Sequence, residues 1–216
     1  KNYFTLEVAL SNYSSEIVFY ASIPTERADL FEKQILSVYP NAKLREHKED
    51  YNPFNADGVT LVAIAEPSEN PAFPLKTFEA FSQAPLNVLL GAFSKMKHDG
   101  EGASVQFVIQ PRGKEFNERY QEARDEVKKG IPVKKALEGE LKRVVSDFAA
   151  VGKEMLFGVK EKEEQEVDQE AVEGLTQKIA SPIVNTNIRI VVSAETEGRA
   201  LSILAELESA FNQFTK

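Results

Sequence analysis

The sequence has no cysteine and only two histidines, His47 and His98. Without cysteine the chain forms no disulfide, carries no thiolate nucleophile and offers no sulfur ligand to zinc. Both histidines lie in charged segments, far apart in the sequence, and a zinc site needs three or four ligands. Asp99 follows His98, but no candidate nucleophile accompanies this pair. We therefore predict surface histidines, no metal site and no cofactor.

Basic residues are in deficit. The chain contains 26 Lys and Arg against 34 Asp and Glu, which gives a net charge of −8 at pH 7. A surface that binds nucleic acid displaces counterions with many Lys and Arg side chains, and anionic membranes attract the same residues. The composition therefore disfavours nucleic acid and anionic membranes as general partners of this domain, although it leaves room for a local basic patch.

Long apolar runs are absent as well. No run approaches the roughly 20 apolar residues that cross a bilayer, and no signal peptide is recognisable. We expect a cytoplasmic domain with no membrane span. Because the chain begins with Lys1 rather than Met, we interpret it as a processed protein or as a fragment. A longer parent protein can hold such a fragment at the inner face of the membrane.

The sequence also lacks a glycine-rich phosphate loop. Gly113-Lys114 follows a predicted strand, as in a P-loop, but Val108 occupies the place of the first glycine. Glu115 stands where the Mg²⁺-binding hydroxyl is required, and a carboxylate there repels phosphate. The second Gly-Lys pair, Gly152-Lys153, likewise lacks the first glycine of a P-loop and is followed by a glutamate. We predict that this chain binds no ATP, has no catalytic residue and is not an enzyme, while a full-length parent can be an ATPase.

The patterns that are present begin with strands. In the first one, Phe4, Leu6, Val8 and Leu10 share one face, as in a half-buried strand. Turn-forming residues separate this run from the next ones. Strands are predicted at 4–10, 17–23, 59–66, 103–110 and 183–194, with a short edge strand at 42–47.

Helical periodicity occupies the segments between these strands. Helices are predicted at 25–39, 85–97, 169–178 and 195–214, and Asp168 is placed to cap the third of them. The expected inward-facing residues are Leu30, Phe31, Ile35 and Val38 in the first helix, Leu86, Leu89, Leu90, Phe93 and Met96 in the second, and Ala200, Leu204, Leu207, Phe211 and Phe214 in the last.

Residues 17–39 resemble residues 188–211 in their organisation. Each stretch is an apolar strand, a short turn that contains Thr-Glu, and an amphipathic helix. Two such units that feed one sheet predict an α+β fold of the ferredoxin-like kind, with a mixed or antiparallel sheet and helices on one face.

A heptad-like pattern begins at residue 116 and resumes after Gly130-Ile131-Pro132. Apolar spacings of three and four on both sides of this break predict an antiparallel helical hairpin, inserted before the last strand. The hairpin either buries its apolar stripe against itself and its own sheet or docks onto a neighbouring subunit. The candidate interaction seam comprises Leu137, Leu141, Val144, Phe148, Val151 and Met155.

The predicted domain organisation has three parts. Residues 1–113 and 168–216 form a discontinuous sheet domain, and residues 114–159 form the helical hairpin. Residues 160–167 form a linker whose charged composition is typical of a solvated connector.

Three segments carry a family resemblance. They are a strand hairpin leading into FEKQILSVYPNA and EDYN, a QFVIQP strand before the insertion, and K-x-A-S-P followed by an IRIVV strand. Together they resemble the domain that precedes the motor in predicted type IV secretion or conjugation-type ATPases of the HerA–FtsK type, notably those of candidate-phyla bacteria. The resemblance covers most of the chain and is weakest over 114–170. It rests on fold signatures, and no catalytic residue matches.

The resemblance implies a non-catalytic assembly or interaction domain that contacts neighbouring subunits or the secretion machinery. Protein partners are then expected, either further copies of the chain or the motor domain. The two βα units leave a second hypothesis open, a ferredoxin-like regulatory domain that senses a small ligand.

Overall fold

The computed structural model describes residues 3–48, 50–66, 75–76, 80–81, 84–137 and 167–214. The chain divides into two compact units. The sheet unit contains the described residues up to 111 and from 184 onward. The helical unit contains the described residues 112–137 and 167–183.

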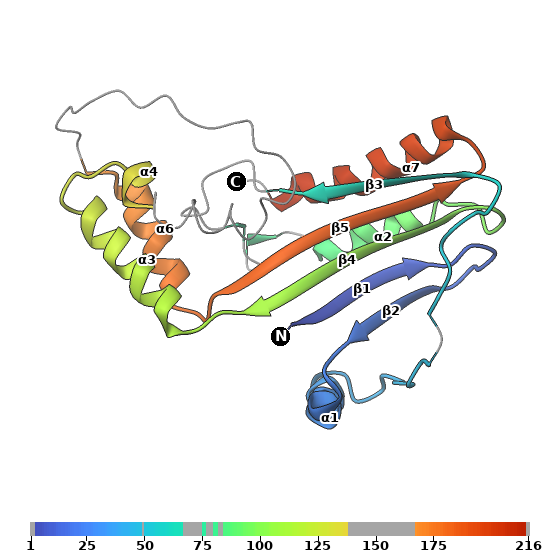
Figure 1. Cartoon of the computed structure of the whole chain (residues 1–216), viewed down its shortest axis with the longest axis horizontal. Coiled ribbons are helices and arrows are strands. Elements are labelled where there is room, and N and C mark those ends of the chain that lie inside the picture. The colour runs from blue at the N-terminus through green and yellow to red at the C-terminus, as the bar shows by residue number, and fades with distance from the viewer. Residues whose placement is uncertain are drawn as a thin grey trace. The chain divides into compact units, whose positions relative to one another are not determined.

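The sheet unit is built on one five-stranded antiparallel sheet with the order β2-β1-β4-β5-β3 (Figure 1). Its strands are β1 (Phe4–Leu10), β2 (Ile17–Ser22), β3 (Val59–Ala65), β4 (Gly102–Pro111) and β5 (Val184–Ala194). Its helices are α1 (Ala28–Val38), α2 (Pro85–Phe93) and α7 (Glu197–Ser209), with the short 3-10 helices η1 (Thr25–Arg27) and η3 (Ala210–Phe214).

The predicted α+β class is confirmed, and part of the sheet has the ferredoxin-like connection. Strands β3 and β4 are both antiparallel to β5, which lies between them, and α2 joins the two. This arrangement is a split βαβ unit. A complete ferredoxin-like order adds a last strand after the second helix, whereas here η3 follows α7. The β1–β2 hairpin instead extends the sheet on the far side of β4.

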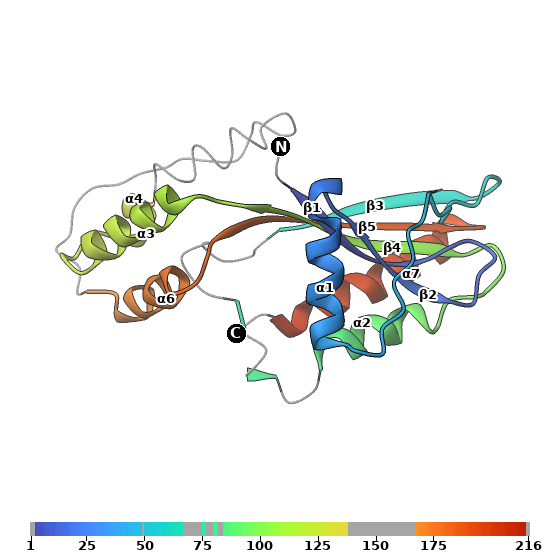
Figure 2. The same cartoon turned by 90° about the horizontal axis from the view of Figure 1, so that it is seen from below.

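Helices α2 and α7 cover the same face of the sheet (Figure 2). The register places Val8, Val105 and Ile190 side by side on that face, and all three are buried. Each fully buried aliphatic side chain contributes about 1.5–3 kcal/mol to folding relative to an exposed one. The helices and the turn after α2 add to this core Leu89, Ala92, Phe93, Met96, Ala200, Ile203, Leu207 and Ala210.

A buried ion pair joins α7 to the loop before β4. Arg199 lies in the first turn of α7, where Thr196 Oγ1 accepts a hydrogen bond from its backbone N–H. Its guanidinium donates to both carboxylate oxygens of Glu101, at 2.7 and 3.0 Å. The backbone N–H of Lys97 donates to the same carboxylate at 2.7 Å. Glu101 therefore fixes the start of α7 against the segment that follows α2.

The predicted edge strand at 42–47 is not formed, and residues 42–48 run as a loop. Only Leu44 and Ala42 in this segment are apolar, so the segment has no continuous face to bury. The following loop is fixed by hydrogen bonds from the Asn12 backbone N–H to the Asn52 carbonyl at 2.9 Å and from the Asn55 N–H to Ser193 Oγ at 2.9 Å.

The helical unit contains α3 (Lys114–Val127), α4 (Val133–Ala136) and α6 (Gln169–Ile179). Gly130, at φ +83°, allows the chain to turn between α3 and α4. The predicted cap of α6 is confirmed, because Asp168 Oδ1 accepts from the Ala171 N–H at 3.0 Å. The core of the unit is formed by Tyr120, Ala123, Val127, Val133, Leu137, Ala171 and Leu175.

The packing of α6 changes the predicted domain boundaries. Helix α6 was assigned to the sheet domain that resumes at residue 168, but its buried face packs on α3 in the helical unit. The sheet unit resumes only at Val184. The second arm predicted for the hairpin is described only as far as residue 137, where it forms α4. Its remainder and the charged linker up to residue 166 lie outside the described residues.

Candidate interaction surface

Helix α1 carries an apolar stripe that the sheet unit does not bury. Glu26 and Asp29 near its N-terminus favour helix initiation, and the helix ends at Tyr39 because Pro40 disfavours helical backbone in the preceding residue. No residue of α1 is buried. Leu30 and Val38 are 52% and 66% exposed. The prediction that this stripe faces the core is therefore wrong.

The comparison with α7 explains why α1 does not pack on the sheet. Aligning Ser22–Glu26 with Ser193–Glu197 places Asp29 and Glu32 at the positions of Ala200 and Ile203, both buried in α7. Burying two unpaired carboxylates costs far more than the apolar contacts would gain. The apolar residues of α1 consequently lie on another side of the helix, where Phe31 and Ile35 are half-buried and Leu30 and Val38 are exposed.

The strands β1 and β2 also carry exposed apolar side chains. Phe19 in β2 and Leu6 in β1 lie on the sheet face that α2 and α7 cover, as their register with Val8 and Phe107 shows. Phe19 is 58% exposed and Leu6 is 38% exposed, so the covering helices do not reach the β2 edge. Figure 2 shows α1 next to this edge.

We define the α1 surface by its apolar members, which extended patches of this kind often use to bind other proteins. These are Leu6, Phe19, Leu30, Phe31, Ile35, Val38 and Tyr39.

A small apolar cleft of about 200 Å³ lies between α2, η3 and the sheet. The amide nitrogen of Gln213, a polar group of its lining, already donates to the carbonyls of Pro85 and Ala210. Leu86 lines the cleft and is 43% exposed, although its position in the periodicity predicted an inward side chain. The cleft is lined by Val8, Pro85, Leu86, Leu89, Phe107, Ala210, Phe211, Gln213 and Phe214.

The opposite sheet face carries an aromatic group that the chain itself covers. An exposed aromatic ring on a sheet face can stack on bases, but Tyr20 is half-buried. It stacks on Tyr51 with a centroid distance of 4.6 Å, and His47 meets it edge-on. The Tyr51 hydroxyl donates to Glu7. Burial, and next this hydrogen bond, raise the pKa of Tyr51 far above its ordinary value. The Tyr20 ring is therefore occupied within the sheet unit.

The predicted interaction seam is placed only at its first residue. Leu137 is 2% exposed and belongs to the core of the helical unit, so it is not available to a partner. Leu141, Val144, Phe148, Val151 and Met155 lie outside the described residues.

The sequence did contain a signal that α1 does not pack like α7. The residues of α1 at the positions that Ala200 and Ile203 occupy in the stretch 188–211 are charged, which is visible without a structure.

Within the described ranges, no group of three or more His, Asp or Glu side chains could hold a metal ion. No helix found there has the length and apolar character needed to cross a membrane.

These features define an α+β domain with a split βαβ unit, a β-hairpin extension and an exposed apolar helix. The chain belongs to the family described as a domain of unknown function (DUF8128), whose model matches residues 5–216. No curated protein and no solved structure matches the chain.

Proposed function

We propose that this chain is a non-catalytic assembly domain that binds another protein through the α1 surface. The observation that carries the proposal is α1 itself, an amphipathic helix whose apolar stripe has no buried residue. A surface helix of a globular protein normally turns such a stripe toward a core. Leaving Leu30, Val38 and Phe19 in water has a cost in solubility that binding to a partner removes.

The resemblance to the domain that precedes the motor in HerA–FtsK-type ATPases supplies the class of partner. The α1 surface then contacts a neighbouring subunit of the ring or the motor domain, on the cytoplasmic side. The absence of a P-loop in the sequence agrees with an accessory role for this chain, with ATP hydrolysis assigned to another domain.

Sedimentation velocity of the purified chain, alone and mixed with a motor domain from its own reading frame, tests this proposal. We expect association that is lost in the Leu30→Asp/Val38→Asp variant. Lys33→Asp is the matched control, since it changes the net charge by the same two units at an exposed position of α1 outside the apolar stripe. A chain that stays monomeric and does not bind the motor contradicts the proposal, as does equal binding by the double variant.

The apolar cleft favours a second candidate, a regulatory domain that binds a small apolar ligand. Its volume of about 200 Å³ is below the 300–1,000 Å³ typical of ligand pockets, which makes this the weaker candidate. Titration with N-phenylnaphthylamine, a fluorescent apolar probe, tests it. Saturable fluorescence that Phe211→Ala alters supports the candidate, and no saturable signal excludes it.

A further inference from the structure

Among the described residues, no strand pairs with the outer edge of β3. Strand β3 is the terminal strand of the sheet order, and its backbone pairs with β5 on one side only within the described residues. Its sequence, VTLVAIA, has no charged residue, no proline and no glycine. Proteins protect such edges with charges, prolines or bulges, and β3 uses none of them.

Apolar side chains flank this edge on both faces of the sheet. Val62 and Ile64 point to the face opposite the helices and are 63% and 56% exposed. On the helical face, α7 packs on β5 and β3, and Leu201 is 52% exposed. An added strand would therefore gain apolar contacts on either face as well as backbone hydrogen bonds.

The position of Leu201 follows from the contacts of α7. Arg199 and Glu206 point toward α2, where they pair with Glu101 and Lys95 at 2.7 and 3.3 Å. Leu201 is two residues from Arg199, which is about 200° around a helix with 3.6 residues per turn. Leu201 therefore lies on the side of α7 away from α2, along the β3 edge.

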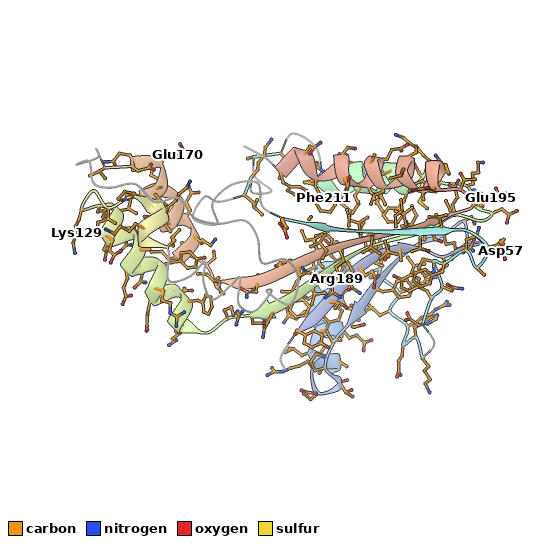
Figure 3. The ribbon with its side chains drawn as sticks, turned by 45° about the horizontal axis from the view of Figure 1, so that its top comes forward. Asp57, Lys129, Glu170, Arg189, Glu195 and Phe211 are labelled. Carbon is orange, nitrogen blue, oxygen red and sulfur yellow. The ribbon has the colours of Figure 1, made fainter. Side chains whose placement is uncertain are left out.

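Exposed carboxylates surround the β3 edge. Figure 3 shows Asp57 and Glu195 at the same end of the sheet. Glu197 and Glu208 flank Leu201 on α7, at about one turn before and two turns after it. Arg189, next to Ile64 in the sheet register, is a basic residue of this region and donates to Asn187 at 2.8 Å. The acidic rim comprises Asp57, Glu66, Glu195, Glu197 and Glu208, all exposed.

The negative charge of the acidic rim distinguishes two candidate occupants of the β3 edge, a second copy of the chain and a segment of another protein. Antiparallel pairing of β3 with β3 of a second copy would bring two acidic rims together, with Glu197 of one α7 near Glu208 of the other. Like charges that are brought close together in this way repel each other. A segment of another protein that carries Lys or Arg on both sides of an alternating apolar stretch is complementary to the edge and to its rim.

We propose that the β3 edge binds an extended, basic-flanked segment of a partner protein as an additional antiparallel strand. The alternate apolar side chains of that segment lie beside Val62 and Ile64 on the face opposite the helices, and the intervening side chains point to the face that carries Leu201. Its Lys or Arg residues pair with the acidic rim. Strand addition of this kind obtains affinity from backbone hydrogen bonds and specificity from alternate side chains. The inference does not rest on the α1 surface.

The test uses the labelled peptide Lys-Lys-Thr-Val-Thr-Val-Thr-Lys-Lys and the same peptide with Glu in place of every Lys. Fluorescence anisotropy gives the affinity, and amide chemical shifts locate the site. We expect binding of the Lys peptide only, shifts confined to Val59–Ala65 and its surroundings, and weaker binding at high ionic strength. Ile64→Lys should weaken binding about tenfold, which corresponds to roughly 1.4 kcal/mol.

Two matched variants separate the causes. Glu197→Lys/Glu208→Lys should reduce affinity about three- to fivefold, as expected for exposed charge pairs. Leu30→Asp/Val38→Asp should leave peptide binding unchanged, so a failure of the α1 surface and a failure of the β3 edge are distinguishable. All four substituted positions are exposed, so the thermal unfolding of both double variants should match that of the unaltered chain.

Three results would overturn the proposal. The first is equal affinity for the Glu peptide, or chemical shifts that map elsewhere. The second is slow hydrogen exchange of every β3 amide in the free protein, which would mean that the edge is already covered. The third is a dimer that Val62→Lys dissociates, which would assign the edge to a second copy.

Discussion

Arg199 and Glu101 form a bidentate ion pair in which the carboxylate is almost completely removed from water. The Glu101 side chain is 4% exposed and that of Arg199 is 30% exposed. Because the backbone N–H of Lys97 also donates to this carboxylate, Glu101 connects the segment after α2 with the first turn of α7. Helix α7 in turn carries Leu201 and two members of the acidic rim, Glu197 and Glu208.

Arg199→Ala should lower the free energy of unfolding by about 2–4 kcal/mol, since it leaves a buried carboxylate without its counter-ion. Glu101→Gln should cost less, because the amide oxygen still accepts from Lys97. Urea unfolding measures both changes. The exposed pair between Lys95 and Glu206 is the control, and Lys95→Ala should change stability by less than about 1 kcal/mol. Equal losses for Arg199→Ala and Lys95→Ala would contradict the structural role of Glu101.

The same ion pair predicts a loss of stability in acid. Burial alone would raise the pKa of Glu101, but the hydrogen bonds from Arg199 and Lys97 and the two positive charges outweigh it and hold the pKa below its ordinary value of 4.5. A carboxyl group with a lowered folded-state pKa contributes its full stability above the unfolded value and loses it as the pH falls through the folded value. Unfolding in urea at neutral pH and at successive acid pH values measures this.

The Glu101→Gln variant isolates the contribution of this carboxyl group. The difference in stability between the unaltered chain and the variant should be largest at neutral pH and should shrink below about pH 4.5. A difference that stays constant across this range would show that the charge of Glu101 does not stabilise the fold.

Leu207 and Leu30 provide a direct test of the two similar strand–helix units. Leu207 is fully buried in α7, whereas Leu30 is 52% exposed in α1. Leu207→Ala should therefore destabilise the chain by about 2–5 kcal/mol, as core truncations do. Leu30→Ala should stay within about 0.5 kcal/mol of the unaltered chain. Thermal and urea unfolding measure both, and a large effect of Leu30→Ala would mean that α1 is buried within the chain.

The sequence predicts the strands of this fold well, because alternation along a strand reflects burial of one face directly. The predicted ranges 4–10 and 103–110 agree with β1 and β4 to within one residue at either end. The prediction of a strand at 42–47 was wrong, because the residues of this segment are mostly charged and leave it with almost no apolar face to bury.

What periodicity does not determine is the partner of each helix. The spacing in α1 is that of a core helix, and only the carboxylates of Asp29 and Glu32, at the positions of Ala200 and Ile203, indicate that it does not pack like α7. Similarly, the apolar stripe of α3 predicted a hairpin partner that follows it directly. The short α4 does pack on α3, but α6, from much later in the sequence, packs on the same core. A stripe defines which face is buried and leaves open which element covers it.

The loop from Asp50 to Gly58 depends on close backbone contact at Gly102. A Cβ atom at this position would lie 2.0 Å from the Pro53 carbonyl oxygen, so a larger residue forces the loop away from the start of β4. Gly102→Ala should therefore destabilise the chain by about 1–3 kcal/mol, as overpacking does. Urea unfolding measures the loss, and faster amide exchange in the loop would locate it.

Gly198 is the matched control for this prediction. It lies in the first turn of α7, and a Cβ atom there meets no other group within 4 Å. Gly198→Ala should therefore stabilise the chain by about 0.4–1 kcal/mol, because alanine restricts the unfolded state at no steric cost. Both variants add one methyl group to a glycine, so opposite signs of the two stability changes test the contact with Pro53 rather than the loss of glycine. If Gly102→Ala is as stable as Gly198→Ala, the loop does not pack against β4 in this way.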